Sequence, residues 1–338
     1  ESTRPYVKAS SAIRFLENRP PDRPFCLALS FSDPHAPHIA LRKYEEIYPL
    51  EEMRLHPTRE GELEEKARRF KIKQRASGAD VAADEDKRRF MAVYYSMISW
   101  VDQNVGRVLE KLHELGLDRD TIVVFTSDHG EFCFEHEMCK KDLVLLDCLL
   151  RVPFFMSWPG RLEPAAVTET FVEEVDVMPT LLDLMGVEVP NGVQGHSFLP
   201  YLRGEADSHR GEVHAEICPP WLSNPYPDYP SFIGEWEEHH EDPEHLLGWT
   251  ASFNVPGDFT KMLRDRRYKY IWYVTGEEEL YDLEEDPQEW HNLAGRPDCE
   301  DVKTGMKLRL LEWNARTEDP LDPLAVRRLQ EQYSEWRA

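Results

Sequence analysis

The chain has 338 residues, 41% of them hydrophobic, which is enough to bury the core of one large domain or of a large and a small one. Its 40 Lys and Arg stand against 64 Asp and Glu, and the formal charge of −24 argues against nonspecific binding to nucleic acid or to an anionic membrane. No apolar run reaches the roughly 18 residues of a membrane-spanning helix. An anionic substrate is not excluded, because a metal ion and a few cations can dominate one pocket.

The cysteine pattern predicts free thiols. None of the six cysteines belongs to a C-x-x-C pair, so a structural zinc site is not expected. Cys26 and Cys148 lie in apolar segments, and both are predicted to be buried. Free thiols are typical of a reducing compartment, which favours a cytoplasmic location over a periplasmic or secreted one. Because the sequence begins with Glu1 and shows no signal peptide, we expect it to be a piece of a longer chain.

The N-terminal region predicts a helix and then a strand. Residues 6–17 place small and aliphatic side chains on one face of an amphipathic helix, and a Pro-rich stretch ends it. Residues 25–31 are an apolar run of strand length. The polar loop after it carries His35, which can either cap a turn or donate a proton at a reactive centre, and His38, which is expected to be structural or on the surface.

The next two segments differ in polarity. Residues 50–87 are charged and contain few large apolar side chains, so we expect an insertion or a helical surface excursion. The mixed charges around residues 62–75 are expected to form a solvated face. Residues 86–115 repeat apolar side chains at steps of three and four and end at Gly116, which predicts a long helix whose Tyr and Met residues face the core.

A β-branched run at residues 121–126 follows and predicts a strand buried on both faces, as in a parallel sheet. It stops at Ser127-Asp128-His129-Gly130-Glu131. Ligands bind beyond the carboxyl ends of such strands, and an Asp beside a His can offer one oxygen and one nitrogen to a metal ion. The alternative is a turn capped by Asp128. In either case Gly130 is expected to let the backbone turn sharply.

The C-terminal half predicts a helix at residues 174–186 and then a long loop-like segment at residues 201–260, rich in Pro, Trp, His and acidic residues. This segment can carry substrate specificity, or it can be an aromatic-packed loop or an oligomer contact. Alternating runs at residues 269–274 and 279–283 predict an antiparallel sheet. Two helices, near residues 301–317 and 323–337, are expected to close the chain.

Several of these segments, in this order and spacing, resemble the sulfatase branch of the alkaline phosphatase superfamily. Two departures from its pattern are present: Phe134 stands where the family usually has Gly, and Cys139-Lys140-Lys141 replaces the more usual Gly-Lys-Gly. Either lysine can be the family lysine, and the spacing to Arg151-Val152-Pro153 favours Lys141. The matching segments are Pro24-Phe25-Cys26-Leu27, Pro34-His35-Ala36-Pro37, Ser127 to Glu131, Glu135-His136, Lys141, Arg151-Val152-Pro153, Trp158-Pro159-Gly160, the helix at 174–186, Gly195 to Pro200, Arg266 to Tyr270 and Glu279 to Pro287.

The resemblance implies an α/β fold: an alkaline-phosphatase-like sandwich of helices around a mostly parallel central sheet, with a smaller C-terminal α+β subdomain that contains an antiparallel sheet. Residues 1–200 would be part of the catalytic α/β domain. Residues 201–338 would form the C-terminal subdomain, with the long aromatic loop, the antiparallel sheet and the terminal helices. The chain would correspond to about the C-terminal two-thirds of a family member.

By resemblance, the function is that of a sulfatase, which hydrolyses a small-molecule or carbohydrate sulfate ester by metal- and formylglycine-dependent chemistry. Asp128 and His129 would supply two ligands of a divalent metal ion, calcium in most sulfatases, with manganese or magnesium as alternatives. Lys141 would neutralise sulfate oxygens, and His35 would lie where the ester oxygen leaves. A homo-oligomer is compatible with the sequence.

The nucleophile of the family is absent from this chain. No Cys has both Pro or Ala at +2 and Arg at +4, and the D-D metal pair of the family's N-terminal part is missing as well. We therefore expect the missing N-terminal segment to be a partner that carries the formylglycine. Two alternatives stay open: a phosphonate monoester or phosphodiester hydrolase of the same superfamily, in which the Asp-His pair also occurs, and a catalytically silent fragment that acts as a binding or scaffold module.

Overall fold

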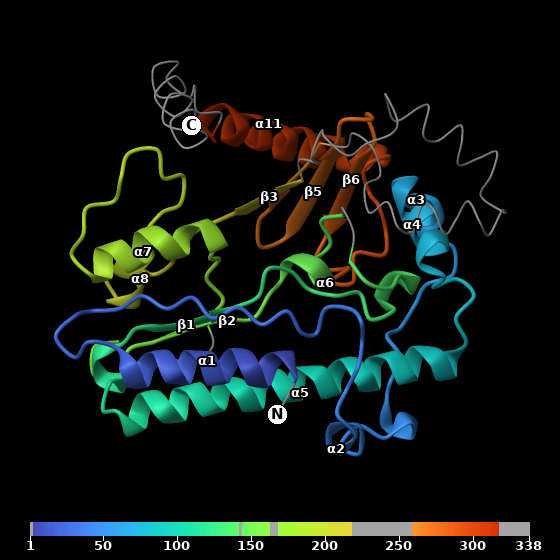
Figure 1. The fold of residues 1–338 in the computed structure, drawn as a ribbon. Helices are drawn as coiled ribbons and strands as arrows, with labels where there is room; N and C mark the ends of the chain where they lie inside the picture. The colour runs from blue at the N-terminus through green and yellow to red at the C-terminus, as the bar shows by residue number, and fades with distance from the viewer. Residues whose placement is uncertain (1–2, 142–143, 163–167, 218–258, 318–338) are drawn as a thin grey trace, which may run out of the picture. The chain divides into compact units, whose positions relative to one another are not determined.

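The computed structural model describes residues 3–141, 144–162, 168–217 and 259–317 (Figure 1). The chain divides into two compact units, the first formed by residues 1–166 and 220–257 and the second by residues 167–219 and 258–338. The domain boundary predicted at residue 200 rests on the family resemblance and on the change of composition after it, and it stays a prediction. The aromatic segment at 218–258 and the helix predicted at 323–337 lie outside the described residues.

Two long helices dominate the described part of the first unit, and both were predicted from the sequence. Helix α1 (Arg4–Asn18) lies along α5 (Asp84–Glu114) (Figure 1). The buried face of α1 carries Ala9, Ala12 and Leu16, small or aliphatic side chains that let two helix backbones approach closely. The N-terminal end is anchored by the Trp100 indole, whose Nε1 donates to Thr3 Oγ1 at 3.1 Å.

Short helices lie between and after these two. Their bounds are α2 (Arg42–Glu45), η1 (Leu50–Glu52), α3 (Glu62–Glu65), α4 (Arg69–Ser77), η2 (Asp118–Asp120), η3 (Glu135–Glu137) and α6 (Asp147–Leu150). The solvated face expected at 62–75 is wrong in part, because Glu62, Lys66, Arg69 and Phe70 are all buried. Charged side chains can be buried when they are paired, and a sequence pattern does not distinguish these from solvated charges.

The strand predicted at residues 121–126 is present as β1 (Val123–Thr126), which pairs with β2 (Phe154–Ser157). The pair is antiparallel, so the parallel pairing predicted for this strand is not seen within the described residues. Nor is β1 buried on both faces: three of its residues are half-buried and Thr126 is exposed. The Phe125 and Phe155 rings stack across the pair with centroids 4.9 Å apart.

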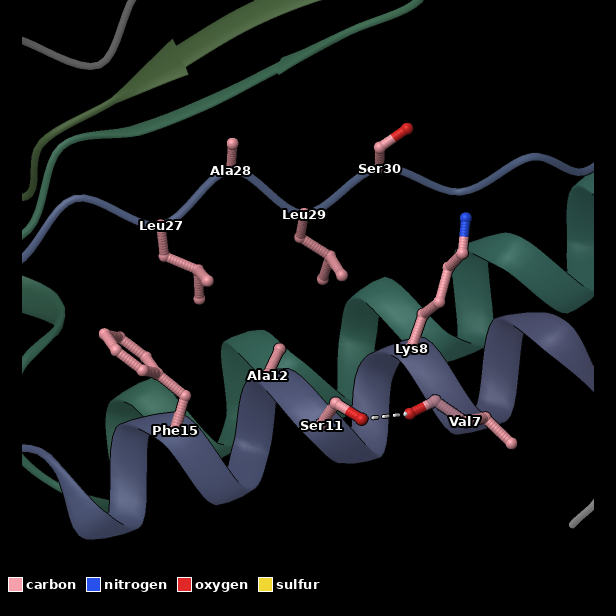
Figure 2. Close-up of a pocket in the computed structure, with 9 residues that line it drawn as sticks. All are labelled: Val7, Lys8, Ser11, Ala12, Phe15, Leu27, Ala28, Leu29 and Ser30. Atoms are coloured by element: carbon pink, nitrogen blue, oxygen red, sulfur yellow. Dashed lines mark hydrogen bonds between the residues drawn. The ribbon is translucent and has the colours of Figure 1, made fainter. Parts of the chain in front are cut away.

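Residues 25–31 are extended but form no strand among the described residues, so the strand predicted there is wrong. A strand requires a neighbour whose N–H and C=O groups pair with its own. Figure 2 shows the period-two alternation that an extended chain imposes: Leu27 and Leu29 point toward α1, whereas Ala28 and Ser30 point away from it. A cavity of about 360 Å³ lies between this run and α1.

The free cysteines are confirmed for the part of the chain that the structure describes, where all five cysteines are unpaired by disulfides. Cys26, however, is exposed, and the prediction of a buried thiol there is wrong because the run that carries it is largely uncovered. Cys148 is only half-buried. Within the described ranges, no helix has both the length and the hydropathy that crossing a membrane requires.

The second unit contains the predicted antiparallel sheet. Its elements are η4 (Glu174–Asp176), α7 (Val177–Leu184), α8 (Leu199–Leu202), β3 (Val213–Ile217), β4 (Thr260–Arg264), β5 (Tyr268–Tyr273), β6 (Glu278–Asp282), η5 (Pro297–Cys299) and α11 (Glu300–Thr317). The strand order is β3-β4-β5-β6, antiparallel throughout. Helix α11 lies against this sheet (Figure 1). Met306 and Leu310 of α11 pack with Leu263, Tyr270 and Leu280 of the sheet.

A buried carboxylate holds the loops of the second unit together. Asp176 is 0% exposed and accepts hydrogen bonds from Arg210 Nε at 2.7 Å, from His209 Nε2 at 2.9 Å and from the backbone N–H of His196 at 2.8 Å. Gly195 lies so close to the carbonyl of Val175 that a Cβ there would overlap it. These contacts give a physical reason why the segment that contains Asp176 and the segment that begins at Gly195 occur together.

Candidate active site

The turn after β1 presents Asp128 and His129 side by side at the surface. The Asp128 side chain is 84% exposed, and its Oδ1 accepts the His129 N–H at 3.1 Å. Its Oδ2 lies 3.5 Å from His129 Nε2. The predicted pair of an oxygen and a nitrogen ligand type is therefore present with both donor atoms next to each other.

The hydrogen bonds of His129 fix which ring nitrogen is available. Nδ1 lies 2.8 Å from the carbonyl oxygen of Gly130, which can only accept, so Nδ1 carries the proton. In the neutral ring Nε2 then offers its lone pair, and Lys141 Nζ lies 2.7 Å from it. A backbone carbonyl on the far nitrogen is also the usual way in which a metal-binding histidine is oriented. Of the two adjacent lysines, Lys141 is the one that reaches this pair.

Gly130 is required for a reason other than the one predicted. Its φ is not positive, so it makes no turn that only glycine allows. Instead its N–H donates to Leu149 O at 2.7 Å, and a Cβ at this position would overlap the carbonyl of Cys148. The glycine lets the turn after β1 lie directly against α6.

His35 lies in the exposed loop after the extended run, and its side chain bonds within that loop, Nδ1 to Ala36 O at 2.8 Å. His38 lies in the same loop; burial lowers the pKa of His38, and the charges of Lys140 and His35 lower it further. Its ring packs edge-on against Phe90 of α5 at 4.7 Å. The structure thus brings Asp128, His129 and Lys141 together directly, and it shows no hydrogen bond between His35 and any of these three residues.

Tyr94 is a site neighbour that sequence reasoning missed, because it was assigned to the helix core. It is half-buried, and its ring lies 6.3 Å from that of His38. Burial raises the pKa of Tyr94, and the negative charges of Glu131 and Asp128 raise it further, so the hydroxyl stays a neutral donor. The sequence feature that could have indicated Tyr94 is its polar hydroxyl on the buried face of a helix, four residues after Phe90.

Glu131 follows His129 by two residues and has a buried carboxyl oxygen. Burial raises the pKa of its carboxyl to about 7, although hydrogen bonds from the backbone of Cys133, Lys140 and Phe132 and the charge of Lys141 lower it. Within the described residues its Oε1 has no hydrogen-bond partner. A buried carboxyl with such a pKa, two residues from His129, is typical of functional sites.

The segment from residue 133 to 140, called here the 133–140 turn, has an unusual backbone. Five of the six non-glycine residues with positive φ in the described chain lie in it, namely Cys133, Phe134, His136, Glu137 and Lys140, with φ from 46° to 69°. Each such residue costs about 1 kcal/mol or more. Phe134 has a φ of 69° and stands where the family that the sequence resembles usually has Gly. Glycine adopts this conformation without strain, which explains the family's preference.

The thiols of this turn are not nucleophiles. Burial raises the pKa of Cys139 to about 12, and the negative charge of Glu131 raises it further. Burial and Glu131 also raise the pKa of Cys133. A thiol attacks as its thiolate, so neither cysteine replaces the missing family nucleophile.

The ligand atoms of Asp128 and His129 decide which metal ions suit this position. A carboxylate oxygen and an imidazole Nε2 with its lone pair available suit a divalent cation such as manganese, and a carboxylate suits calcium. Across the described ranges no group of three or more His, Cys, Asp or Glu side chains is placed to hold a metal ion. The described residues therefore supply two ligand types side by side but no complete set of metal ligands.

Comparison with known proteins bears on these observations. The family model "Sulfatase" matches residues 8–187, and the model "N-sulphoglucosamine sulphohydrolase, C-terminal" matches residues 247–316. The chain is 29% identical to the multifunctional alkaline phosphatase superfamily protein PehA of Trinickia caryophylli, over 89% of this chain and 57% of that protein. It is 30% identical to the delta 4,5-hexuronate-2-O-sulfatase of Bacteroides thetaiotaomicron, over 72% of this chain and 45% of that protein.

Among solved structures, the phosphonate monoester hydrolase SpPMH of Silicibacter pomeroyi superposes with a TM-score of 0.76 at 26% identity, covering 93% of this chain and 61% of that one. The predicted alkaline-phosphatase-like fold with a C-terminal antiparallel sheet is thereby confirmed. The chain spans about half the length of the relatives it matches by sequence. Because a family model covers more than half of its residues, the chain belongs to the sulfatase family.

Proposed function

We propose that this chain is the larger part of a sulfatase that hydrolyses sulfate esters, with its nucleophile, a formylglycine, on a segment outside the 338 residues. The observation that carries the proposal is the contact of Lys141 Nζ with His129 Nε2 at 2.7 Å, beside the Asp128 carboxylate. A lysine cation next to a metal-type pair suits a small, highly charged anionic group. It does so in a protein whose overall charge of −24 would otherwise repel such a group.

Each residue has a role that follows from its bonding. Asp128 and His129 would hold a divalent cation, calcium by family resemblance, through a carboxylate oxygen and Nε2. When bound, the cation would polarise the sulfate group and lower the pKa of an attacking hydroxyl. Lys141 would move from His129 Nε2 to the sulfate oxygens, where its charge is most stabilising as negative charge develops.

His35 would serve the leaving group. Its Nδ1 is engaged by the carbonyl oxygen of Ala36, so Nε2 is the nitrogen that can hold a proton for transfer to the departing ester oxygen. The exposed position of the loop that carries it leaves this nitrogen accessible to a substrate.

A carbohydrate sulfate is the substrate class we favour. Support comes from the hexuronate sulfatase among the relatives, which shares 30% identity over most of this chain. The sugar itself is left open.

A phosphonate monoester or phosphodiester hydrolase is the second candidate. It is favoured by the likeness to the Silicibacter pomeroyi phosphonate hydrolase, at a TM-score of 0.76, and by a metal pair of Asp-His type. Both candidates would use the same Asp-His pair and the same lysine, so turnover must separate them.

The test uses the natural protein that contains this chain, with 4-nitrophenyl sulfate and 4-nitrophenyl phenylphosphonate as probes. We expect faster turnover of the sulfate, and mass spectrometry should find one Cys converted to formylglycine. Lys141→Ala should lower kcat/KM for the sulfate by about 100-fold, as loss of a transition-state donor does. The adjacent, exposed Lys140 provides a matched control. Lys140→Ala should change kcat/KM for the sulfate only a few-fold.

Faster turnover of the phosphonate would favour the second candidate. No turnover of either probe, together with an unconverted Cys, would indicate a catalytically silent binding module. Equal losses in the Lys140 and Lys141 variants would contradict the role assigned to Lys141.

A further inference from the structure

The 133–140 turn needs an external support, because five of its residues hold a backbone conformation that their side chains disfavour. Such a conformation persists only where surrounding contacts determine it. One closing contact is internal: the Phe132 N–H donates to Lys140 O at 3.0 Å. Further contacts come from residues 56–74, more than fifty residues earlier in the chain.

Three consecutive side chains of the turn each bind a different part of residues 56–74. Glu135 Oε2 lies 3.9 Å from His56 Nδ1. His136 Nδ1 donates to Glu62 Oε1 of α3 at 2.5 Å. Glu137 Oε2 accepts from Gln74 Nε2 of α4 at 3.2 Å.

The central contact of the three is buried, whereas the other two are only partly so. Glu62 is 3% exposed and His136 is 1% exposed. Lys66 Nζ lies 3.4 Å from the same Glu62 oxygen, with its side chain fully buried. Phe132 covers the imidazole edge-on at 6.3 Å. A buried, charge-assisted hydrogen bond of this kind is directional and specifies one arrangement of the groups it joins.

The turn ends at the site lysine. Lys140 closes the turn through its carbonyl, and the next residue, Lys141, places Nζ 2.7 Å from His129 Nε2. Because the backbone is continuous, a change in the turn moves the base of the Lys141 side chain.

We propose that Glu62 and His136 form a clamp that holds the 133–140 turn in its strained conformation and so positions Lys141 beside His129. Both are positioning residues that act through Lys141 and touch no substrate. The effect on turnover rests on the proposed function, but the effect on the turn does not.

The test uses the natural protein that contains this chain and the variant His136→Asn. Asn tolerates positive φ, so the backbone at residue 136 is retained while the bond to Glu62 is lost, and the Glu62–Lys66 pair is left in place. His113→Asn is the matched control, since it removes an exposed histidine that pairs with Asp118 at 2.9 Å.

Two readouts are needed. Amide hydrogen exchange should increase about tenfold or more across residues 132–141 in His136→Asn, with α1 and β4 unchanged, and it should not change in His113→Asn. In 4-nitrophenyl sulfate hydrolysis, His136→Asn should lower kcat about tenfold in the wild-type background. The same substitution should have almost no further effect in the Lys141→Ala background, because a residue acting through Lys141 loses its influence when Lys141 is absent.

The clamp is overturned if exchange across 132–141 does not rise, or if His136→Asn lowers kcat equally in both backgrounds. If His136→Asn does not fold, Glu62→Gln tests the same contact from the other side with a side chain of equal size. If the natural protein hydrolyses neither probe, the proposed function fails while the exchange experiment still decides whether the clamp holds the turn.

Discussion

The Asp176 carboxylate of the second unit allows a prediction whose magnitude can be worked from the structure. Burial opposes its ionisation, but hydrogen bonds from Arg210 and from the backbone of His196 and Glu173 outweigh burial and lower its pKa from the ordinary 3.8 to about 2. That difference corresponds to about 2 kcal/mol of folding stability at neutral pH. Asp176→Asn keeps the size of the side chain and removes the charge, so it should lower the free energy of unfolding by about 2 to 3 kcal/mol.

The sign of the pH dependence follows from the lowered pKa. The contribution of Asp176 is fully present above about pH 4 and is lost as the pH falls through about 2, where the carboxyl is protonated in the folded state as well. Urea unfolding should therefore show a constant difference between wild type and Asp176→Asn from pH 5 to 7, and the difference should shrink between about pH 4 and 2.

A matched control lies in the same unit. Arg296 and Asp298 form a similar two-bond pair, with Nη2 and Oδ2 2.6 Å apart, but their side chains are 58% and 62% exposed. Asp298→Asn should leave the urea midpoint unchanged, because solvent screens an exposed pair. An equal effect at both positions, or a difference that persists at pH 2, would refute the reasoning from burial.

Three further substitutions test the site. Gly130→Ala should lower the melting temperature by several degrees and weaken Mn²⁺ binding at Asp128-His129, because the new Cβ overlaps the Cys148 carbonyl; unchanged binding would contradict the close approach. Lys140→Gly should raise the free energy of unfolding by up to about 1 kcal/mol, since it relieves a φ of 68° at an exposed position. Phe134→Gly relieves the same strain but loses a buried ring that packs on Phe90, so a net loss of about 2 kcal/mol is expected in urea titration, and a gain would refute it.

Elements with a strong local period were predictable. The helices at 6–17 and 86–115 correspond to α1 and α5 within two residues at each end, and the antiparallel strands at 269–274 and 279–283 correspond to β5 and β6. In each case the pattern of apolar side chains matches the period of the element and one face is buried, so local and tertiary preferences agree.

The run at residues 25–31 shows where such reasoning fails. Its composition is that of a strand, but a strand is completed only by hydrogen bonds to a neighbour, and none of the described residues pairs with it. The antiparallel direction of β1 and β2 was likewise invisible, because a run of apolar residues carries no information about the direction of its partner.

The sequence by itself determined the adjacency of Asp128 and His129, since neighbouring residues after a strand end are necessarily close. It also determined the family, because its motifs occur in a fixed order along the chain. Only the tertiary structure decided that Lys141, twelve residues on, reaches His129, and that Glu62 meets His136 across 74 residues. A buried, paired charge and a solvated one look alike in sequence, and the difference between them is made by packing, which brings distant segments together and removes water.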